Sequence, residues 1–235
     1  VLDEPVFDEQ MRTWTGLHLI PGLYVLESNA GQMGSSLEWI ARLMNGSAIN
    51  PVAVLSAEAM GSIPGAHGIR STIGASVFNA AAMEPPVDNL AFSTVAVRTG
   101  EPARADMARA ILEGMAYSIR ANIEQIQEII PIAFTDLKVG GGITHSSLWT
   151  EMISNILNCR VQVSASAEVS ALGAAICAGV GAGLYPDLLA GVRGLVQSAR
   201  EHQPSQDMPI YQDLYQEWKS LRQKRQPSDT AVASI

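Results

Sequence analysis

The sequence is short of charged side chains, and of positive ones in particular. Charged residues make up 16% of the 235 residues, whereas about 25% is usual in soluble domains. The formal net charge is −8, and Lys138, Lys219 and Lys224 are the only lysines. Binding to nucleic acid or to an anionic membrane requires a cluster of lysine and arginine. The sequence therefore predicts neither nucleic acid nor a membrane as a partner.

Long apolar runs, cysteine pairs and metal-ligand spacings are missing as well. No apolar stretch approaches the roughly 20 residues of a membrane-spanning helix, and no signal-peptide pattern is recognised, so we expect a cytoplasmic protein. Cys159 and Cys177 lie in apolar surroundings without CxxC spacing, and we expect two buried, reduced thiols. The four histidines lie far apart, so no metal site is predicted.

The order of the predicted elements indicates an α/β fold. Residues 13–28 read as a β-hairpin with its turn at Pro21-Gly22, and residues 61–88 read as loop with short strands. Strand, helix, strand and helix alternate over residues 136–182, which is typical of an α/β layer. Helices are expected over residues 34–45, 52–60, 103–130, 148–157, 170–182, 188–201 and 210–224, and strands over 136–139 and 161–163.

A glycine run provides the first candidate ligand site. Gly140-Gly141-Gly142 follows a predicted strand and precedes a helix that Ser146 or Ser147 can cap. Glycine lacks the Cβ that would keep a phosphate away from the backbone, and the start of a helix presents free N–H groups. On spacing alone, a tight strand-to-helix turn that binds no ligand explains the glycines equally well.

Two further segments have both a binding and a packing interpretation. The small residues of Glu168–Ala175 suit a purine face or close helix packing, and packing alone explains them. In Gly34–Trp39, Gly34 could admit a phosphate, whereas Trp39 is expected to anchor the core. Neither segment by itself decides for a ligand.

No pattern points to a catalytic residue. There is no GxSxG elbow and no indication of a Cys/His pair, so nucleophilic catalysis has no support. Asp88, Asp106, Glu113 and Glu151 could act as bases, but they are better explained as solvated helix faces or caps. The chain therefore has no predicted catalytic residue.

Taken in order, five segments resemble the second domain of the FGGY carbohydrate kinases, a family that includes glycerol, xylulose, ribulose, gluconate and autoinducer-2 kinases. The last three of the five are specific, and together they favour this family over actin- or chaperone-type ATPases. The segments are Gly34–Trp39 (G-x-x-x-x-W), Pro64–Gly68 (P-G-A-x-G), Arg109–Tyr117 (R-A-x-L-E-G-x-A-[FY]), Val139–Trp149 (G-G-G-x-x-x-S-x-L-W) and Glu168–Gly179 (E-x-x-A-L-G-A-A-x-x-A-G).

The resemblance implies a ribonuclease H-like, actin-like ATPase domain over residues 1–226, with a disordered tail at 227–235. Such a domain is the ATP-binding half of a two-domain kinase that transfers the γ-phosphate to a sugar or polyol hydroxyl with Mg²⁺. The implied partners are that small-molecule substrate and the protein's own N-terminal kinase domain, which this chain lacks. Residues 178–185 and 204–218 are similar to autoinducer-2 kinases, although pentulose kinases share much of this pattern.

The resemblance also implies the residues that contact the nucleotide. Gly34 would approach the terminal phosphates, Gly141 and Gly142 the phosphates and ribose, and Ser146, Ala171 and Leu172 the adenine.

Several departures limit what this chain does alone. Family members use an aspartate of the first domain as the base, and no counterpart is found here, so we expect the isolated chain to be inactive. Glu38 stands where relatives carry glutamine or arginine, and His67 replaces a common aspartate or asparagine. The alternative function is a non-catalytic nucleotide-binding or interaction module derived from such a kinase. Low charge further predicts that the chain forms homo-oligomers.

Overall fold

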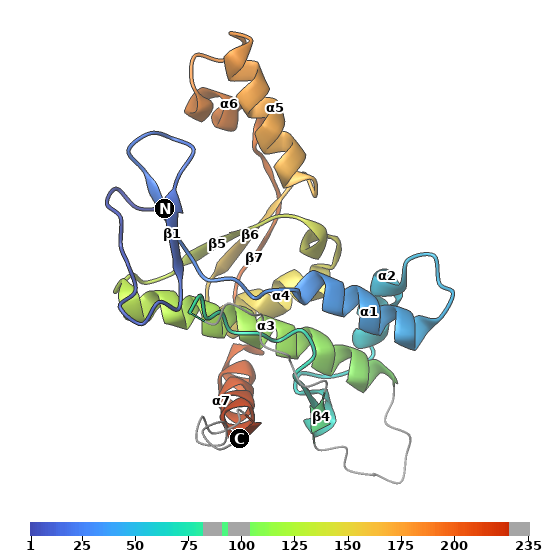
Figure 1. Ribbon diagram of the computed structural model, residues 1–235. Helices are drawn as coiled ribbons and strands as arrows, with labels where there is room; N and C mark the ends of the chain where they lie inside the picture. Colours follow the sequence, from blue (N-terminus) through green and yellow to red (C-terminus); the bar gives the residue numbers. More distant parts are fainter. Residues whose placement is uncertain (82–90, 94–103, 226–235) are drawn as a thin grey trace, which may run out of the picture.

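The computed structural model describes residues 1–81, 91–93 and 104–225. Within these ranges the strands form two two-stranded sheets and one three-stranded sheet. Helices pack with them around one long helix, α3 (Arg104–Ile129) (Figure 1). The predicted tail at 227–235 and the end of the predicted loop at 61–88 lie outside the described residues.

The predicted hairpin is present near the N-terminus. β1 (Trp14–Leu17) pairs antiparallel with β2 (Tyr24–Glu27). The turn between them contains Gly22, whose φ of 81° lies in the left-handed region that glycine enters without strain. The predicted hairpin and its predicted turn are therefore both confirmed.

Two helices follow the hairpin, as the hydrophobic periodicity predicts. α1 (Met33–Asn45) buries Leu37 and Ile40, and α2 (Pro51–Ala59) packs beside it. Trp39 is 49% exposed, so its prediction as a core anchor was wrong. At 100° per residue, position 39 lies on the side of the helix opposite to position 37.

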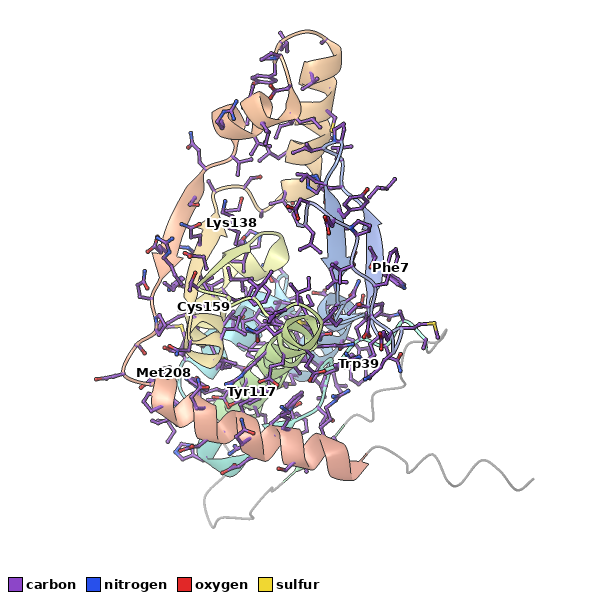
Figure 2. All side chains as sticks on the ribbon, turned by 90° about the vertical axis from the view of Figure 1, so that its left-hand side faces the viewer. Phe7, Trp39, Tyr117, Lys138, Cys159 and Met208 are labelled. Carbon is purple, nitrogen blue, oxygen red and sulfur yellow. The ribbon has the colours of Figure 1, made fainter. Side chains whose placement is uncertain are left out.

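The centre of the molecule is α3, where a helix over 103–130 is predicted. Every residue from Ala108 to Ser118 is buried. The helix packs against α2, against α4 (Ser147–Leu157) and against α7 (Met208–Arg225). Figure 2 shows Tyr117 between α3 and α7, where its ring lies 5.8 Å from that of Trp218.

The predicted α/β layer follows α3. β5 (Asp136–Val139) pairs in parallel with β6 (Arg160–Ser164), and α4 crosses between them. A short 3₁₀ turn, η2 (Gly142–His145), joins the glycine run to α4. On its other side β6 pairs antiparallel with β7 (Ser198–His202).

The predicted helix at 188–201 is wrong beyond its first half. α6 (Leu188–Leu195) ends at Val196, which has extended dihedrals, and β7 begins at Ser198. The edge of β6 offers backbone hydrogen bonds to this segment, and such tertiary pairing overrides local helix preference.

α5 (Val169–Gly181) and α6 stand away from the rest of the molecule at the top of Figure 1. They pack on each other, with Tyr185 lying against Gly179. Because little else covers α5, Cys177 is exposed, which corrects the prediction of two buried thiols. Cys159, just before β6, is buried as predicted, and burial raises the pKa of its thiol.

Three short elements lie between α2 and α3. η1 (Ala66–Gly68) lies in the predicted P-G-A-x-G loop, and β3 (Arg70–Ser71) pairs with β4 (Phe92–Ser93). Gly65, Ala66, His67 and Gly68 all have positive φ, so the loop is a left-handed turn. In the part of the chain that the structure describes, no helix could span a membrane.

Candidate functional site

One pocket has a volume of about 810 Å³, within the range of about 300–1,000 Å³ that is common for small-molecule sites. Its walls are the first turn of α1, one face of α2, the glycine turn after β5 and the first turns of α4. Most of the lining is apolar, with Leu37, Met60 and Trp149 among the contributors. Several elements distant in sequence therefore meet around one cavity.

The starts of three helices line this pocket. Met33 and Gly34 belong to the first turn of α1, Asn50 is the N-cap of α2, and Ser146 is the N-cap of α4. Backbone N–H groups at helix starts carry a partial positive charge that favours anions. The pocket can therefore hold negative charge without a cationic side chain.

The three helix starts differ in whether a side chain already accepts a hydrogen bond from one of their first N–H groups. The side chain of Asn50 accepts a hydrogen bond from the Ala53 N–H at 3.0 Å, and the Ser146 hydroxyl accepts one from the Trp149 N–H at 3.2 Å. Gln32 at the start of α1 makes no such side-chain hydrogen bond, and the first turn of α1 contains no acidic residue. The start of α1 is thus the most available anion position of the three.

Each glycine of the turn after β5 has a separate role. A Cβ on Gly140 would lie 2.5 Å from the Val169 side chain, so Gly140 allows the start of α5 to pack closely. Gly141 has a φ of 83°, which forms the turn. Gly142 lines the pocket and has open space where a side chain would begin, as Gly34 has across the pocket.

Charged side chains are scarce around the pocket. Among the described residues that line it, none is lysine or arginine, Glu151 is the sole carboxylate and His145 the sole histidine. The positive potential that an anionic ligand would meet here comes from the backbone. In the described part of the chain, no group of three metal-ligating side chains gathers at one place.

The structure brings together only part of the predicted nucleotide contacts. Gly34, Gly142 and Ser146 line the pocket, and Gly141 lies in the same turn. Ala171 and Leu172 are on α5 and are not among the residues that line it.

Sequence reasoning missed the contribution of α2, which supplies one wall of the pocket from Asn50 to Met60. Its lining residues are small or apolar, and nothing in their order distinguishes a pocket wall from a core helix. Only the capping residue Asn50 could have indicated from the sequence that the start of α2 contributes to a site. The sequence predicts a solvated Glu151, and the residue is exposed, but it lies at the pocket wall.

A buried polar network supports the left-handed turn over Gly65–Gly68. The Glu113 carboxylate accepts hydrogen bonds from the Gly65 N–H at 2.9 Å and from Arg109 at 3.1 Å. Arg109 also donates to the Ser62 carbonyl and to the Tyr211 hydroxyl, which ties the loop to α7. Burial raises the pKa of Glu113 despite the opposing effect of these donors.

The network corrects two predictions made for acidic residues. Glu113 is 1% exposed and Asp106 is 8% exposed, so neither belongs to a solvated helix face. Asp106 instead accepts a hydrogen bond from Ser62 and contacts His67. Asp88 lies outside the described residues.

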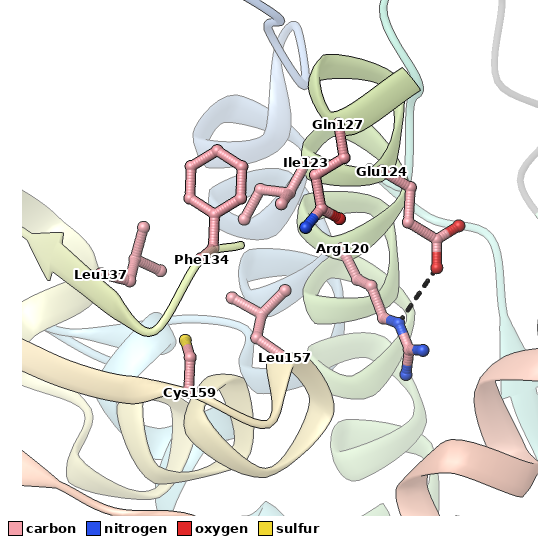
Figure 3. Close-up of a pocket in the computed structure, with 8 residues that line it drawn as sticks. All are labelled: Arg120, Ile123, Glu124, Gln127, Phe134, Leu137, Leu157 and Cys159. Atoms are coloured by element: carbon pink, nitrogen blue, oxygen red, sulfur yellow. Dashed lines mark hydrogen bonds and ion pairs between the residues drawn. The ribbon is translucent and has the colours of Figure 1, made fainter. Parts of the chain in front are cut away.

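A second, much smaller cavity lies between α3 and β5 (Figure 3). Its volume is about 120 Å³, and Phe134, Leu137, Leu157 and Cys159 provide apolar walls. Arg120 and Glu124 of α3, hydrogen-bonded to each other at 3.2 Å, lie beside it. Its volume is below the usual range for small-molecule sites, so we do not assign the nucleotide to it.

Residues 2–182 match the model of the FGGY family of carbohydrate kinases, C-terminal domain. The match covers most of the chain, so the chain belongs to this family.

Among curated proteins, the chain is 27% identical to an autoinducer-2 kinase of Salmonella paratyphi A, over 94% of this chain and 43% of that protein. It is 28% identical to an autoinducer-2 kinase of Photorhabdus laumondii, again over 94% and 43%. The chain thus spans less than half of the length of these relatives.

Solved structures of the same family share the fold. The xylulose kinase of Rhodospirillum rubrum matches with a TM-score of 0.69 and 24% identity, over 91% of this chain and 42% of that one. The glycerol kinase of Plasmodium falciparum, solved with ADP, matches with a TM-score of 0.77 and 18% identity, over 97% and 44%. The predicted fold class, an α/β actin-like ATPase domain, is confirmed, and the family model that matches is that of a C-terminal domain.

Proposed function

We propose that this chain is the nucleotide-binding half of an ATP-dependent sugar or polyol kinase, a cytoplasmic phosphotransferase. The observation that carries the proposal is the convergence of three helix starts and a glycine turn on one largely apolar pocket. Apolar walls suit a nucleoside, and unsatisfied N–H groups suit its phosphates. In our proposal residues 1–226 form this single domain, and the tail at 227–235 takes no part in binding.

The proposed orientation follows from where the pocket is positive. Phosphates lie toward Gly34 at the start of α1 and along the bare backbone of Gly141 and Gly142. Ser146 lies near the base. We retain Ala171 and Leu172 as adenine contacts only for a conformation in which α5 approaches the pocket.

Mg²⁺ would be held mainly by the phosphates. It prefers oxygen ligands and is commonly bound through one or two carboxylates together with substrate phosphates. Glu151 is the one described carboxylate on the pocket wall, so this chain does not form a Mg²⁺ site by itself. The ion, when bound, would neutralise charge on the transferred phosphoryl group.

Catalysis would require a second domain. Phosphoryl transfer depends on positioning and on charge stabilisation between groups on both sides of the phosphate. The chain has no assigned base, and its relatives are more than twice as long. We propose that an N-terminal kinase domain supplies the base and most contacts to the sugar or polyol, and that the chain alone is inactive.

A binding measurement tests the pocket assignment in the intact protein. The substitution Gly142→Val places a branched side chain in open space facing the pocket, so the fold should be kept while the phosphates are excluded. We expect calorimetry to show ATP affinity reduced by about tenfold or more, equivalent to ~1.4 kcal/mol.

The matched control is Gly181→Val, which also enters open space but at the far end of α5, outside the pocket lining. It should bind ATP as the unsubstituted protein does. Equal affinities for the Gly142→Val variant and the unsubstituted protein would remove the nucleotide from this pocket.

A further inference from the structure

Glu151 has an unusual position among the acidic residues of this chain. It lies in the second turn of α4, is exposed, and is the one carboxylate on the wall of an otherwise apolar or neutral pocket. Within the described residues it makes no hydrogen bond or ion pair, although its charge acts on the nearby His202 ring. Its acceptor oxygens are therefore available to whatever enters the pocket.

Charge decides which part of a nucleotide can lie beside this side chain. Two like charges a few ångström apart repel each other strongly near a protein surface, and no lysine or arginine of the lining offsets Glu151. The phosphates are therefore excluded from its neighbourhood, and they have a favourable position at the start of α1. What remains for Glu151 is the base or the ribose.

We propose that Glu151 is a specificity-determining residue that accepts a hydrogen bond from the exocyclic amino group of adenine. This inference rests on the proposed function and deepens it. An ionised carboxylate can only accept hydrogen bonds. Adenine presents an amino group at C6, whereas hypoxanthine and guanine present a carbonyl oxygen there, which a carboxylate repels. Glu151 thus favours ATP over 6-oxopurine nucleotides.

The experiment compares ATP with ITP in the intact protein. The two nucleotides differ only in the group at C6 and the protonation at N1, and calorimetry gives a dissociation constant for each. Hydrogen bonds to a charged group discriminate by roughly tenfold or more, so we expect ITP to bind at least about tenfold more weakly than ATP.

The substitution Glu151→Gln should remove most of that preference. An amide can either donate or accept, so the ratio of the two constants should fall to about threefold or less. Glu201→Gln makes the same change at an exposed β7 carboxylate outside the pocket, and it should leave the ratio unchanged.

The outcomes separate this inference from the proposed function. If neither nucleotide binds the unsubstituted protein, the proposed function fails. If both bind it equally well, the function stands and the role of Glu151 is overturned. If Glu151→Gln weakens ATP and ITP by the same factor, the carboxylate contacts the ribose and base selection is again overturned.

Discussion

At the scale of single residues, Gly114 illustrates how closely α3 approaches its neighbours. A Cβ at this position would lie 2.3 Å from the carbonyl oxygen of Ser71 in β3. No real Cβ tolerates that distance, so either the helix or the strand would have to shift. The glycine of the R-A-x-L-E-G-x-A-[FY] segment is therefore explained by packing.

We predict that Gly114→Ala destabilises the intact protein. Overpacking of this kind typically costs about 1–3 kcal/mol, and here the obstacle is backbone, which cannot rotate away. Urea unfolding followed by circular dichroism measures the change. Gly181→Ala, at an exposed position with open space, serves as the control and should be neutral or slightly stabilising. Equal stability for both variants would contradict the close approach.

Single residues also mark the limit of sequence reasoning at the site. The glycine turn and its Ser146 cap could be predicted because few other residues satisfy that geometry. The role of Glu151 could not, because an acidic residue on a helix is usually solvated and only the fold places it beside a pocket. The prediction for Glu113 failed for a related reason: Arg109 stands four residues before it on the same helix, but the Gly65 N–H comes from a loop 48 residues away that no local spacing reveals.

At the scale of elements, α7 is fastened to α3 by a polar cluster as well as by aromatic rings. Glu124 of α3 accepts hydrogen bonds from Tyr215 at 2.7 Å and from Lys219 at 2.8 Å. Arg120 stacks over the Tyr215 ring at 4.0 Å. Burial raises the pKa of Glu124, but these donors and the Arg120 charge hold it below its ordinary value of 4.5.

That pKa shift predicts an acid-sensitive contact. A carboxyl group whose pKa is lowered in the folded state stabilises the fold at pH values above its ordinary pKa. This contribution is lost as the pH falls below about 4.5. Glu124→Gln should lower stability at pH 7 by about 0.5–1 kcal/mol, because the group is still partly screened by solvent. The substitution should also make the free energy of unfolding fall less steeply as the pH drops below the ordinary glutamate pKa.

Unfolding curves at several pH values measure both effects. Glu128→Gln, at an exposed carboxylate of the same helix that contacts Arg12, is the control. An acid decline of the same steepness in the Glu124 variant and the unsubstituted protein would show that this contact carries no proton linkage.

Elements were predicted well where a long hydrophobic period or a specific turn residue fixed them. α3 and the hairpin belong to this class. The sequence predicts the end of a helix at β7 because Ser198 to His202 has no alternating pattern of its own, and the segment becomes a strand only by pairing with β6. The strand forms because it pairs with a segment that is distant in sequence, and local sequence preference cannot predict such a pairing.

At the scale of the whole molecule, the helical pair α5–α6 leaves several large apolar side chains exposed. Leu184 is 76% exposed, Leu189 49% and Val192 39%. Between Val169 and Leu195 only Asp187 and Arg193 carry charge. Exposed apolar side chains on a helical pair with so few charges are typical of a surface that another protein segment covers. In the proposed kinase, the N-terminal domain is the expected cover.

We predict that the 235-residue chain by itself associates reversibly through this surface. Sedimentation velocity over a hundredfold range of concentration should show a rising average mass. Leu184→Ser combined with Leu189→Ser should reduce the association, whereas Leu43→Ser, at a 67% exposed position on α1, should not. A strictly monomeric chain at every concentration would contradict the prediction.

The two strands that support α5–α6 are neighbours in the sheet. Ser164 at the end of β6 pairs with Ser198 at the start of β7, and the Ala165 N–H donates to the Gln197 carbonyl. In evolutionary terms, α5–α6 is an excursion from the tip of a β-hairpin. Because lengthening a surface loop costs little free energy, insertions or deletions between α5 and α6 would leave the register of the sheet intact. Lineages of this domain can therefore vary the length of this excursion while keeping the glycine turn that Val169 packs against.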